Sequence, residues 1–590
     1  MVINKISSQL QIALRYDNLL AAETKSLFIK DPLIGMWEVI VQYVNSLEEI
    51  RQKYDFEMYL LGQGYAQVII QKNKIVQLTD EANIIYISVS QSMSYTDLNL
   101  SQVCAGETSL PTGNYQITGR EFLLAVVDSG IDYMHTDFRN EDGTTRIKYL
   151  WDQGIQGKPP LGFSEGTLYT EEQINEALKA GTKEEALALI PSIDTLGHGT
   201  AMAGVAGGNG RGSVGRRNKG MAPECNFIIV KVKRASVGAG PSSLELMQGI
   251  HFALLRAKEL QIPLVILLGS GYNMASHNGD GVLSKYIELV YRTWLCNIVV
   301  GVGNEADRGS HYQGKLIDGK QDEVEILVEE NLSRYACSIW NPISDEIEII
   351  IQSPSGEQTE KLSIITPNRA YLFDNTGVII NFSEPIINMT QNEIFITLQG
   401  QDGGDINKGI WKIFIIGKRI LRGEYNLWTK LIPDRQNKTK ILSPEISITL
   451  TIPSDSKGLT TVGAYNGSTM QLASFSGRGY TLDNRVKPEI VAPGVNVEVP
   501  SSRDGELYTV MSGTSIAAAF VAGAYILMQA YGIVQLGNIG LYGDTLEVYL
   551  IRNAKRPEAN APYPNIRWGY GLLCLEAALN DMREVANNTN

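Results

Sequence analysis

Short apolar runs that end in glycine-rich turns and lead into helical patterns begin near residue 121. Four such runs cover residues 122–127, 227–232, 264–268 and 298–302, and a helical pattern over 244–257 lies between two of them. Strands that are apolar throughout are buried on both faces, so the pattern predicts an α/β domain with a parallel sheet covered by helices on both sides. A functional site is expected at the carboxyl ends of the strands.

The chain on either side of these runs follows other patterns. Residues 35–90 alternate short β-patterned runs with one helical run, which predicts a small α+β unit. From about 316 to 452 helical patterns nearly disappear, and apolar residues recur at every second position, as in Ile347, Ile349 and Ile351. This alternation predicts an inserted all-β sandwich of jelly-roll type, because the α/β pattern resumes after it.

These patterns divide the chain into domains. At 590 residues it is too long for one compact core. We predict an N-terminal α+β domain over 1–96, a first part of the α/β domain over 97–315, the inserted β-sandwich over 316–452, and a second part of the α/β domain over 453–590.

Composition restricts the partners and cofactors. The formal charge of −13 comes from 64 acidic and 51 basic residues spread along the chain, which argues against nucleic acid or an anionic membrane surface as a partner. The cysteines are scattered without a CxxC pair: Cys104, Cys225, Cys296, Cys337 and Cys574. We therefore predict free thiols, no disulfide framework, no cofactor and no required metal.

The N-terminal stretch MVINKISSQLQIALRYDNLL has no apolar core of a secretory signal, and no window approaches 18 consecutive apolar residues. Neither a signal peptide nor a membrane span is readable from these patterns. The expectation is a protein that stays within the cell that makes it.

Five histidines make the search for a catalytic base short: His135, His198, His251, His277 and His311. His198 stands in DTLGHGTAMAGVAGG (194–208), with glycines on both sides and small residues at helical spacing after it. This predicts an imidazole held at the first turn of a closely packed helix. A lone histidine can also be structural, but that alternative does not explain the glycine and alanine neighbours.

Three other side chains stand at strand ends or helix starts. Asp128 ends an apolar strand, where a carboxylate needs a partner such as an imidazole, although an aspartate there can also serve the turn. Asn304 follows another strand in VVGVGNEADRG, where its amide could donate to an oxyanion or belong to an ordinary glycine turn. Ser515, in MSGTSIAAAF (511–520), is a nucleophile or a helix-capping hydroxyl.

All four groups fall in one α/β unit in the order Asp, His, Asn, Ser. The order of Asp, His and Ser among them is that of the subtilisin triad. Seven stretches resemble subtilisin-type serine proteases, the subtilases of peptidase family S8: VVDSGID, GHGTAMAG, GMAPECNFIIVKV, GVGNE, ASFSGRG, VKPEIVAPGVNV and SGTSIAAAFVAG. Together they cover essentially the whole α/β part. Capping is then expected to be a second role of Ser515.

The resemblance implies a role for each group. Ser515 would attack the scissile carbonyl, His198 would take its proton and return it to the leaving amine, and Asp128 would orient and stabilise the imidazolium. Asn304 and the backbone N–H of Ser515 would hold the oxyanion. One departure is Ala519, which stands where subtilases usually have proline.

A substrate-binding edge is expected from Gly269, Ser270, Gly271 and Gly303. The stretch LGSGYN (268–273) departs here from the Ser-Leu/Phe-Gly motif of subtilases. In HTDF, Asp137 matches a position that ligates calcium in some subtilases, but one carboxylate is not enough to predict a metal site.

Within the subtilases the chain is similar to the clostridial Csp-type spore germination proteases. His198 and Ser515 are separated by a β insertion, an N-terminal propeptide-like unit is present, and RIKYLWDQ (146–153) and LTTVGAYN (459–466) resemble that group. The resemblance implies a spore-associated protease that activates a cortex-lytic enzyme zymogen. It also implies a propeptide that is cut off and stays bound non-covalently.

The extended stretch YISVSQSMSYTDL (86–98) is long enough to reach the strand ends, so autocleavage is expected between Ser92 and Asp97. The alternative is a plain interdomain linker. For the whole chain, the alternative to an active endopeptidase is a catalytically latent binding or germination-signalling protein with a retained propeptide.

Overall fold

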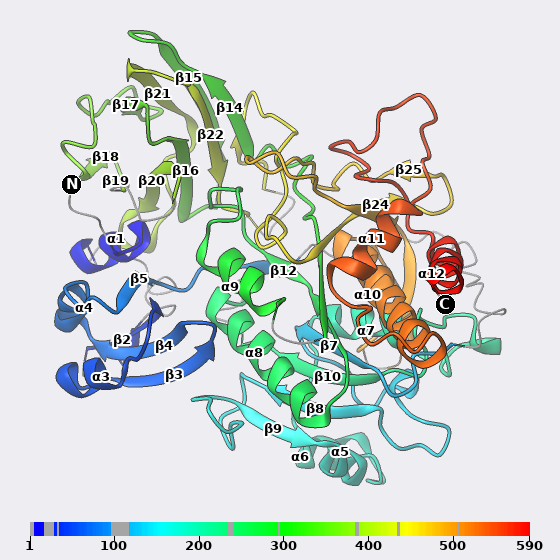
Figure 1. The fold of residues 1–590 in the computed structure, drawn as a ribbon. Coiled ribbons are helices and arrows are strands. Elements are labelled where there is room, and N and C mark those ends of the chain that lie inside the picture. Colours follow the sequence, from blue (N-terminus) through cyan, green and yellow to red (C-terminus); the bar gives the residue numbers. More distant parts are fainter. Residues whose placement is uncertain are drawn as a thin grey trace.

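The computed structural model describes residues 5–16, 29–31, 35–95, 117–233, 240–292, 295–329, 331–383, 389–432, 437–503, 505 and 507–589. Figure 1 shows the N-terminal unit beside the central α/β domain, with the inserted β strands at one end of the molecule. The predicted fold class is confirmed. The predicted boundary at 96/97 lies outside the described residues, as does Cys104.

The central sheet has the strand order β25-β24-β13-β11-β7-β10-β8-β9, with β26 beside β24. Its strands are β7 (Leu123–Asp128), β8 (Ile147–Asp152), β9 (Thr167–Thr170), β10 (Asn226–Lys231), β11 (Leu264–Leu268), β13 (Cys296–Gly301), β24 (Thr460–Asn466), β25 (Gln471–Leu472) and β26 (Ile490–Pro493). Neighbours from β24 to β8 run parallel. Their carboxyl ends therefore meet at one edge.

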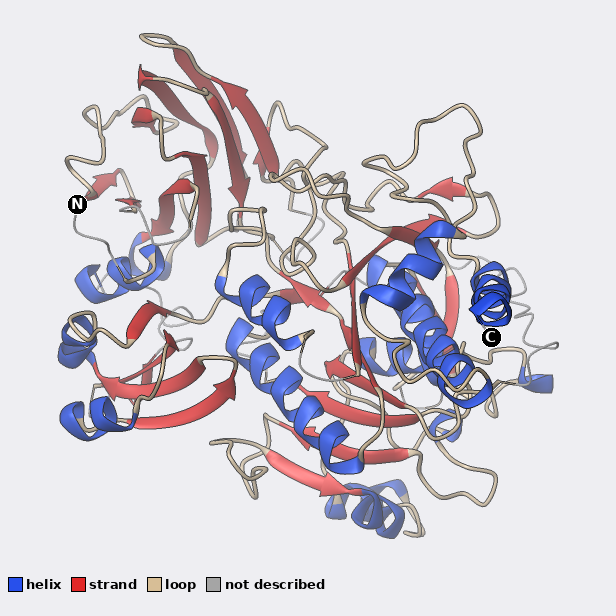
Figure 2. Cartoon of the chain, viewed as in Figure 1, coloured by secondary structure: helices blue, strands red, loops and turns tan. Residues whose placement is uncertain are grey.

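Helices cover both faces of this sheet (Figure 2). One face packs on α7 (His198–Gly207) and α10 (Thr514–Ala530), and the other on α8 (Ser243–Leu260) and α9 (Val282–Val290). Along β7, Leu124 and Val126 belong to the first core, whereas Leu123, Ala125 and Val127 belong to the second. This double burial explains why the strands are apolar at every position.

Other elements of the α/β domain lie outside the sheet core. The helices are α5 (Glu171–Ala177), α6 (Lys183–Leu189), α11 (Asp544–Arg552) and α12 (Leu575–Thr589), and the π-helical turn Tyr531–Gln535 continues α10. A two-stranded ribbon pairs β27 (Val497–Pro500) with β28 (Tyr508–Met511) just before α10. Among the described helices, Thr514–Gln535 alone is long and apolar enough to cross a membrane, and 94% of its apolar 18-residue window is buried inside the protein. Its apolar character is that of a core helix.

The N-terminal unit is a sheet with helices, as predicted. It contains α1 (Ser8–Tyr16), β1 (Ile29–Asp31), β2 (Met36–Tyr43), α3 (Glu48–Tyr54), β3 (Glu57–Gly62), β4 (Tyr65–Gln71), α4 (Lys72–Leu78) and β5 (Ile84–Ser88). The sheet docks on the helices of the α/β domain, since the Tyr286 hydroxyl of α9 donates to the carbonyl of Leu61 at 2.9 Å. Helix α1 contacts the inserted sandwich, where the Asn381 amide donates to the Ser8 carbonyl.

The insertion is a sandwich of two antiparallel sheets with its own core. One sheet contains β14 (His311–Lys315), β22 (Glu424–Thr429), β16 (Arg334–Pro342), β20 (Gln391–Gly400), β19 (Thr376–Phe382) and β18 (Asn368–Phe373). The other contains β17 (Glu346–Gln352), β21 (Gly409–Arg419), β15 (Gln321–Val328) and β23 (Lys440–Ile441). β14 precedes residue 316, so the sandwich begins slightly earlier than the sequence predicts.

Candidate active site

Asp128, His198 and Ser515 meet at the carboxyl edge of the sheet. Nδ1 of His198 lies 2.7 Å from Oδ1 of Asp128, and its Nε2 lies 2.8 Å from Oγ of Ser515. All three residues are buried. With its proton on Nδ1, the imidazole donates to Asp128 and offers Nε2 as the acceptor for the serine proton, which is the arrangement that general-base activation of a hydroxyl requires.

The glycines around His198 are required by geometry. Gly197, which precedes α7, has φ 72°, a left-handed conformation that favours glycine. A Cβ on Gly199 would come 2.2 Å from the carbonyl oxygen of Gly130, in the turn that follows Asp128. The two segments that carry the imidazole and the carboxylate can therefore approach each other only because these positions lack side chains.

Ser515 is the second residue of α10, and Gly513 occupies the N-cap position without a side-chain cap. The expectation that Ser515 also caps its helix is wrong, because Ser515 lies within the first turn, past the N-cap position, and its hydroxyl bonds to His198. The first turn of α10 directs its N–H groups and the positive end of its dipole toward the serine. Ala519 is fully buried within α10.

Asn304 lies beside the start of α10. Its Oδ1 accepts a hydrogen bond from the Thr514 N–H at 3.0 Å. With its oxygen held by this bond, the amide has Nδ2 as its donor group, which is the group that the predicted oxyanion role requires. Gly303, directly before it, has φ 105°, and a Cβ there would lie 2.7 Å from Thr451, so this turn also requires glycine.

The predicted substrate-binding edge forms strand β12 (Ser270–Gly271). It begins at the triad, since a Cβ on Gly269 would lie 2.8 Å from Cε1 of His198. It continues into Tyr272, which exchanges backbone hydrogen bonds of 2.8 and 3.0 Å with Ile452. β12 therefore leads away from the catalytic groups as a short strand.

A segment of the N-terminal unit occupies the free edge of β12. In β6 (Ser94–Tyr95), Ser94 pairs with Gly271 and Tyr95 with Ser270, in antiparallel register. Residues 270 and 271 thus pair with a segment of the same chain, and their role in binding substrate stays a prediction.

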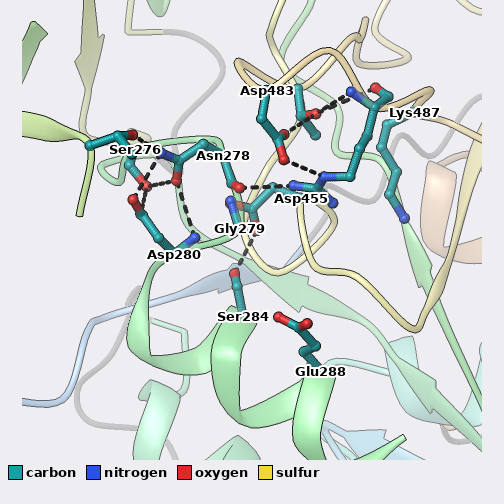
Figure 3. Close-up of polar contacts among 12 residues, drawn as sticks. Ser276, Asn278, Gly279, Asp280, Ser284, Glu288, Asp455, Asp483 and Lys487 are labelled. Atoms are coloured by element: carbon teal, nitrogen blue, oxygen red, sulfur yellow. Dashed lines mark hydrogen bonds and ion pairs between the residues drawn. The ribbon is translucent and has the colours of Figure 1, made fainter. Parts of the chain in front are cut away.

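The loop after β12 is anchored by polar side chains (Figure 3). Buried Asp455 accepts from the N–H of Gly279 at 2.9 Å and from the Ser284 hydroxyl at 2.5 Å. Burial raises the pKa of this carboxyl. Arg485 adds a bond to the Asn278 carbonyl at 2.9 Å. These contacts hold the loop against the segment that pairs with Tyr272.

The other histidines lie away from the triad. His277 and His311 both stack on Trp428, at ring-centroid distances of 4.0 and 4.8 Å. His251 packs beside Phe163, and His135 accepts from the backbone of the residue two positions on. Each has a structural environment, so the choice of His198 as the base does not depend on elimination alone.

Both carboxylate oxygens of Asp137 accept hydrogen bonds from protein groups. Its Oδ1 accepts from the Gly212 N–H at 2.8 Å and its Oδ2 from the Tyr508 hydroxyl at 2.7 Å. In the described part of the chain no group of three or more His, Cys, Asp or Glu side chains has the arrangement of a metal site. The cysteines described, Cys225, Cys296, Cys337 and Cys574, are free thiols.

Sequence reasoning missed two contributors to the site. Asp194 opens the quoted histidine motif but was not singled out, and it bonds to the segments around both Asp128 and His198. Met93, in the N-terminal tail, is buried in the core beside α8. The position of Asp194 four residues before the histidine was available as a clue, whereas the burial of Met93 depends on a contact between distant segments.

A parallel sheet covered on both faces, with Asp, His and Ser joined in that order at its carboxyl edge, defines a subtilisin-type serine peptidase. Residues 119–259 and 437–571 match the subtilase family, and residues 4–90 match the Csp protease B prodomain. The solved structure of the Clostridium perfringens CspB protease is 30% identical, with a TM-score of 0.73, and the match covers 80% of this chain and 95% of that one. The chain belongs to the subtilase family, among the Csp proteases.

More distant relatives share the peptidase domain. The PII-type proteinase of Lacticaseibacillus paracasei is 24% identical over 547 residues, which is 80% of this chain and 26% of the relative. The C5a peptidase of Streptococcus pyogenes is 23% identical over 432 residues, covering 70% of this chain and 35% of the relative. The chain thus spans only about a quarter to a third of the length of these relatives.

Proposed function

We propose that this chain is a serine endopeptidase that cuts off its own N-terminal domain, keeps it bound, and then activates a spore cortex-lytic enzyme zymogen by limited cleavage during germination. The observation that carries the proposal is the backbone pairing of residues 92–95 with β12 on one side and with residues 241–242 on the other. The germination role and a location inside the producing cell, associated with the spore, rest on the resemblance to the Csp group.

Residues 92–95 form an extended segment that makes backbone hydrogen bonds to β12 on one side and to residues 241–242 on the other. On one side Ser94 and Tyr95 pair with β12. On the other side the N–H of Met93 donates to the Pro241 carbonyl at 2.7 Å, and Ser92 bridges to Ser242 in antiparallel register. Backbone pairing on both sides is how an extended substrate is bound independently of most of its side chains.

The register indicates where the cut falls. Tyr95 is opposite Ser270, and Gly269, one position closer to the triad, lies against His198. Continuing the antiparallel register by one residue leads to the bond between Thr96 and Asp97, so we propose that bond as the autoprocessing site. It falls within the range 92–97 predicted from the sequence, and both residues lie outside the described part of the chain.

The chemistry follows from the triad. Nε2 of His198 takes the proton of Ser515 as its Oγ attacks the scissile carbonyl, and Asp128 stabilises the imidazolium. The oxyanion is proposed to accept from Nδ2 of Asn304 and from the N–H of Ser515. His198 then protonates the leaving amine, and water completes hydrolysis of the acyl-enzyme by the same steps in reverse.

The second candidate is a latent subtilase that binds or senses without turnover. It is favoured by two observations: Ser515 is only 1% exposed, and residues 94–95 occupy the free edge of β12. A fluorophosphonate probe separates the two, because only an accessible, activated Ser515 reacts. For the germination role, the purified processed enzyme should convert a cortex-lytic zymogen to its shorter form, and the Ser515→Ala chain should not.

A further inference from the structure

A second buried carboxylate lies next to the triad. Asp194 is 1% exposed, and its carboxylate accepts four hydrogen bonds from uncharged donors. Oδ1 accepts from the Ser129 hydroxyl and the Gly197 N–H, both at 2.8 Å. Oδ2 accepts from the N–H and the hydroxyl of Thr200, at 2.9 and 2.7 Å. A buried charge without a basic partner is costly, so this full set of donors calls for an explanation.

The donors belong to the two segments that carry the triad base and its carboxylate. Ser129 directly follows Asp128, while Gly197 and Thr200 flank His198. The network also closes on itself: the Ser129 hydroxyl accepts from the Gly199 N–H at 2.9 Å, and the Thr200 hydroxyl accepts from the Asp132 N–H at 2.9 Å. Asp194 therefore ties the turn after Asp128 to the first turn of α7.

We propose that Asp194 is a positioning residue for peptide hydrolysis, which holds His198 in register with Asp128 and Ser515 without touching the substrate. The His198 bonds of 2.7 and 2.8 Å require the turn after Asp128 and the start of α7 to keep a fixed spacing. A misplacement of about 1 Å in a catalytic group can cost about 10²-fold in rate. Because the Asp194 carboxylate binds both segments, it prevents the turn after Asp128 and the start of α7 from shifting relative to each other.

The geometry requires a carboxylate at this position. Each oxygen of Asp194 accepts from a backbone N–H, of Gly197 on one side and of Thr200 on the other. An asparagine would place its NH₂ group against one of these N–H groups in either orientation. Hydroxyl donors can rotate away from such a conflict, but backbone N–H groups cannot. Asp194→Asn therefore disrupts the network although it keeps the shape of the side chain.

A purely structural role predicts a different result. The Asp194 carbonyl also accepts from the Ser502 hydroxyl at 2.7 Å, so the residue helps to anchor its own loop. Loss of anchoring alone would lower the fraction of folded molecules and leave the rate of each folded molecule unchanged. The rate per folded molecule is thus the quantity that separates positioning from stability.

The test measures the first-order rate of autoprocessing in the full-length chain after refolding, divided by the folded fraction from circular dichroism. It rests on the proposed autoprocessing, so Ser515→Ala gives the background. Asp194→Asn should be cut about 10- to 100-fold more slowly than wild type. Asp345→Asn is the matched control: Asp345 is a buried carboxylate in the sandwich that accepts three backbone N–H bonds, and its rate should equal that of wild type.

Two further variants keep the result decisive. If Asp194→Asn does not fold, Ser129→Ala and Thr200→Val each remove one hydroxyl donor and should slow the cut several-fold. A rate per folded molecule within twofold of wild type in all variants that fold would overturn the positioning role. If the wild-type chain is not cut, autoprocessing is refuted separately, and the rate of fluorophosphonate labelling of Ser515 on the same variants decides the role of Asp194 by the same criterion.

Discussion

The Nε2 of His198 lies 2.8 Å from the Oγ of Ser515, although 317 residues separate them in the chain. The sandwich accounts for much of that separation, yet it leaves the α/β domain as one continuous sheet, because β13 before the insertion pairs with β24 after it. The first residues of α7 and α10 are thereby brought together.

Asp128→Asn should lower the rate of autoprocessing by about 10⁴-fold without unfolding the protein. An amide facing Nδ1 of His198 favours the tautomer with its proton on Nε2, which cannot accept the serine proton. The cleavage rate after refolding, with circular dichroism as the check on folding, measures this. A loss below tenfold would mean that Asp128 does not orient the base.

Asn304→Asp should lower the rate by about 10²- to 10³-fold. The carboxylate keeps the acceptor for the Thr514 N–H, observed at 3.0 Å, but has no donor for the oxyanion. Asn304→Ala removes both functions and serves as the comparison. Equal rates for wild type and Asn304→Asp would refute the donor role.

Met93→Ala should weaken the hold of the cut N-terminal domain on the enzyme. The Met93 side chain is 1% exposed and packs in the core beside α8. Truncating a buried methionine costs about 2–5 kcal/mol, so the dissociation constant should rise at least about 30-fold. Surface plasmon resonance with separately prepared domains measures this, and Lys53→Ala, on the outer surface of the N-terminal unit, should have no effect.

Glu393→Gln should stabilise the protein at pH 8 and not at pH 5. Glu393 of β20 is buried with Oε1 unpartnered, and burial raises its pKa from 4.5 to about 7. Between these values the folded state binds more protons than the unfolded state, so the free energy of unfolding falls as pH rises, by roughly 3 kcal/mol in total. A glutamine at this position does not ionise, so the variant does not lose this stability as the pH rises.

Thermal unfolding of wild type and Glu393→Gln at pH 5, 6, 7 and 8 measures the difference. The gap in midpoint should widen from pH 5 to pH 7 and change little between pH 7 and pH 8. A constant gap at all four pH values would show that ionisation of Glu393 does not contribute to stability.

Much of the fold could be predicted because it depends on local patterns. Residues 264–268 are apolar throughout and form β11, and the alternation of Ile347, Ile349 and Ile351 places alternate side chains of β17 in the sandwich core. Edge strands are harder to predict from the sequence for a physical reason. β3 buries only Leu61 fully, and β18 has exposed residues on both faces, so neither carries a clear period.

The catalytic groups were predictable because strand ends and glycine turns constrain them locally. What could not be predicted depends on contacts between distant segments. The Ser515 hydroxyl bonds to His198 in place of a helix N-cap, and Asp137 is satisfied by Tyr508, which lies more than 300 residues away in sequence. Burial of Met93 likewise depends on docking between two domains, and no single stretch of sequence indicates that docking.

The most direct test of the account is N-terminal sequencing of the purified wild-type chain beside Ser515→Ala. We predict a new N-terminus at Asp97 in the wild type, with the fragment 1–96 co-purifying, and an uncut Ser515→Ala chain. If the wild type is cut at another bond and Ser515→Ala is not cut, the proposed cleavage site would be wrong, but the peptidase activity of Ser515 would stand. An uncut wild type that also fails to react with a fluorophosphonate, or identical cleavage in both chains, would contradict hydrolysis by Ser515.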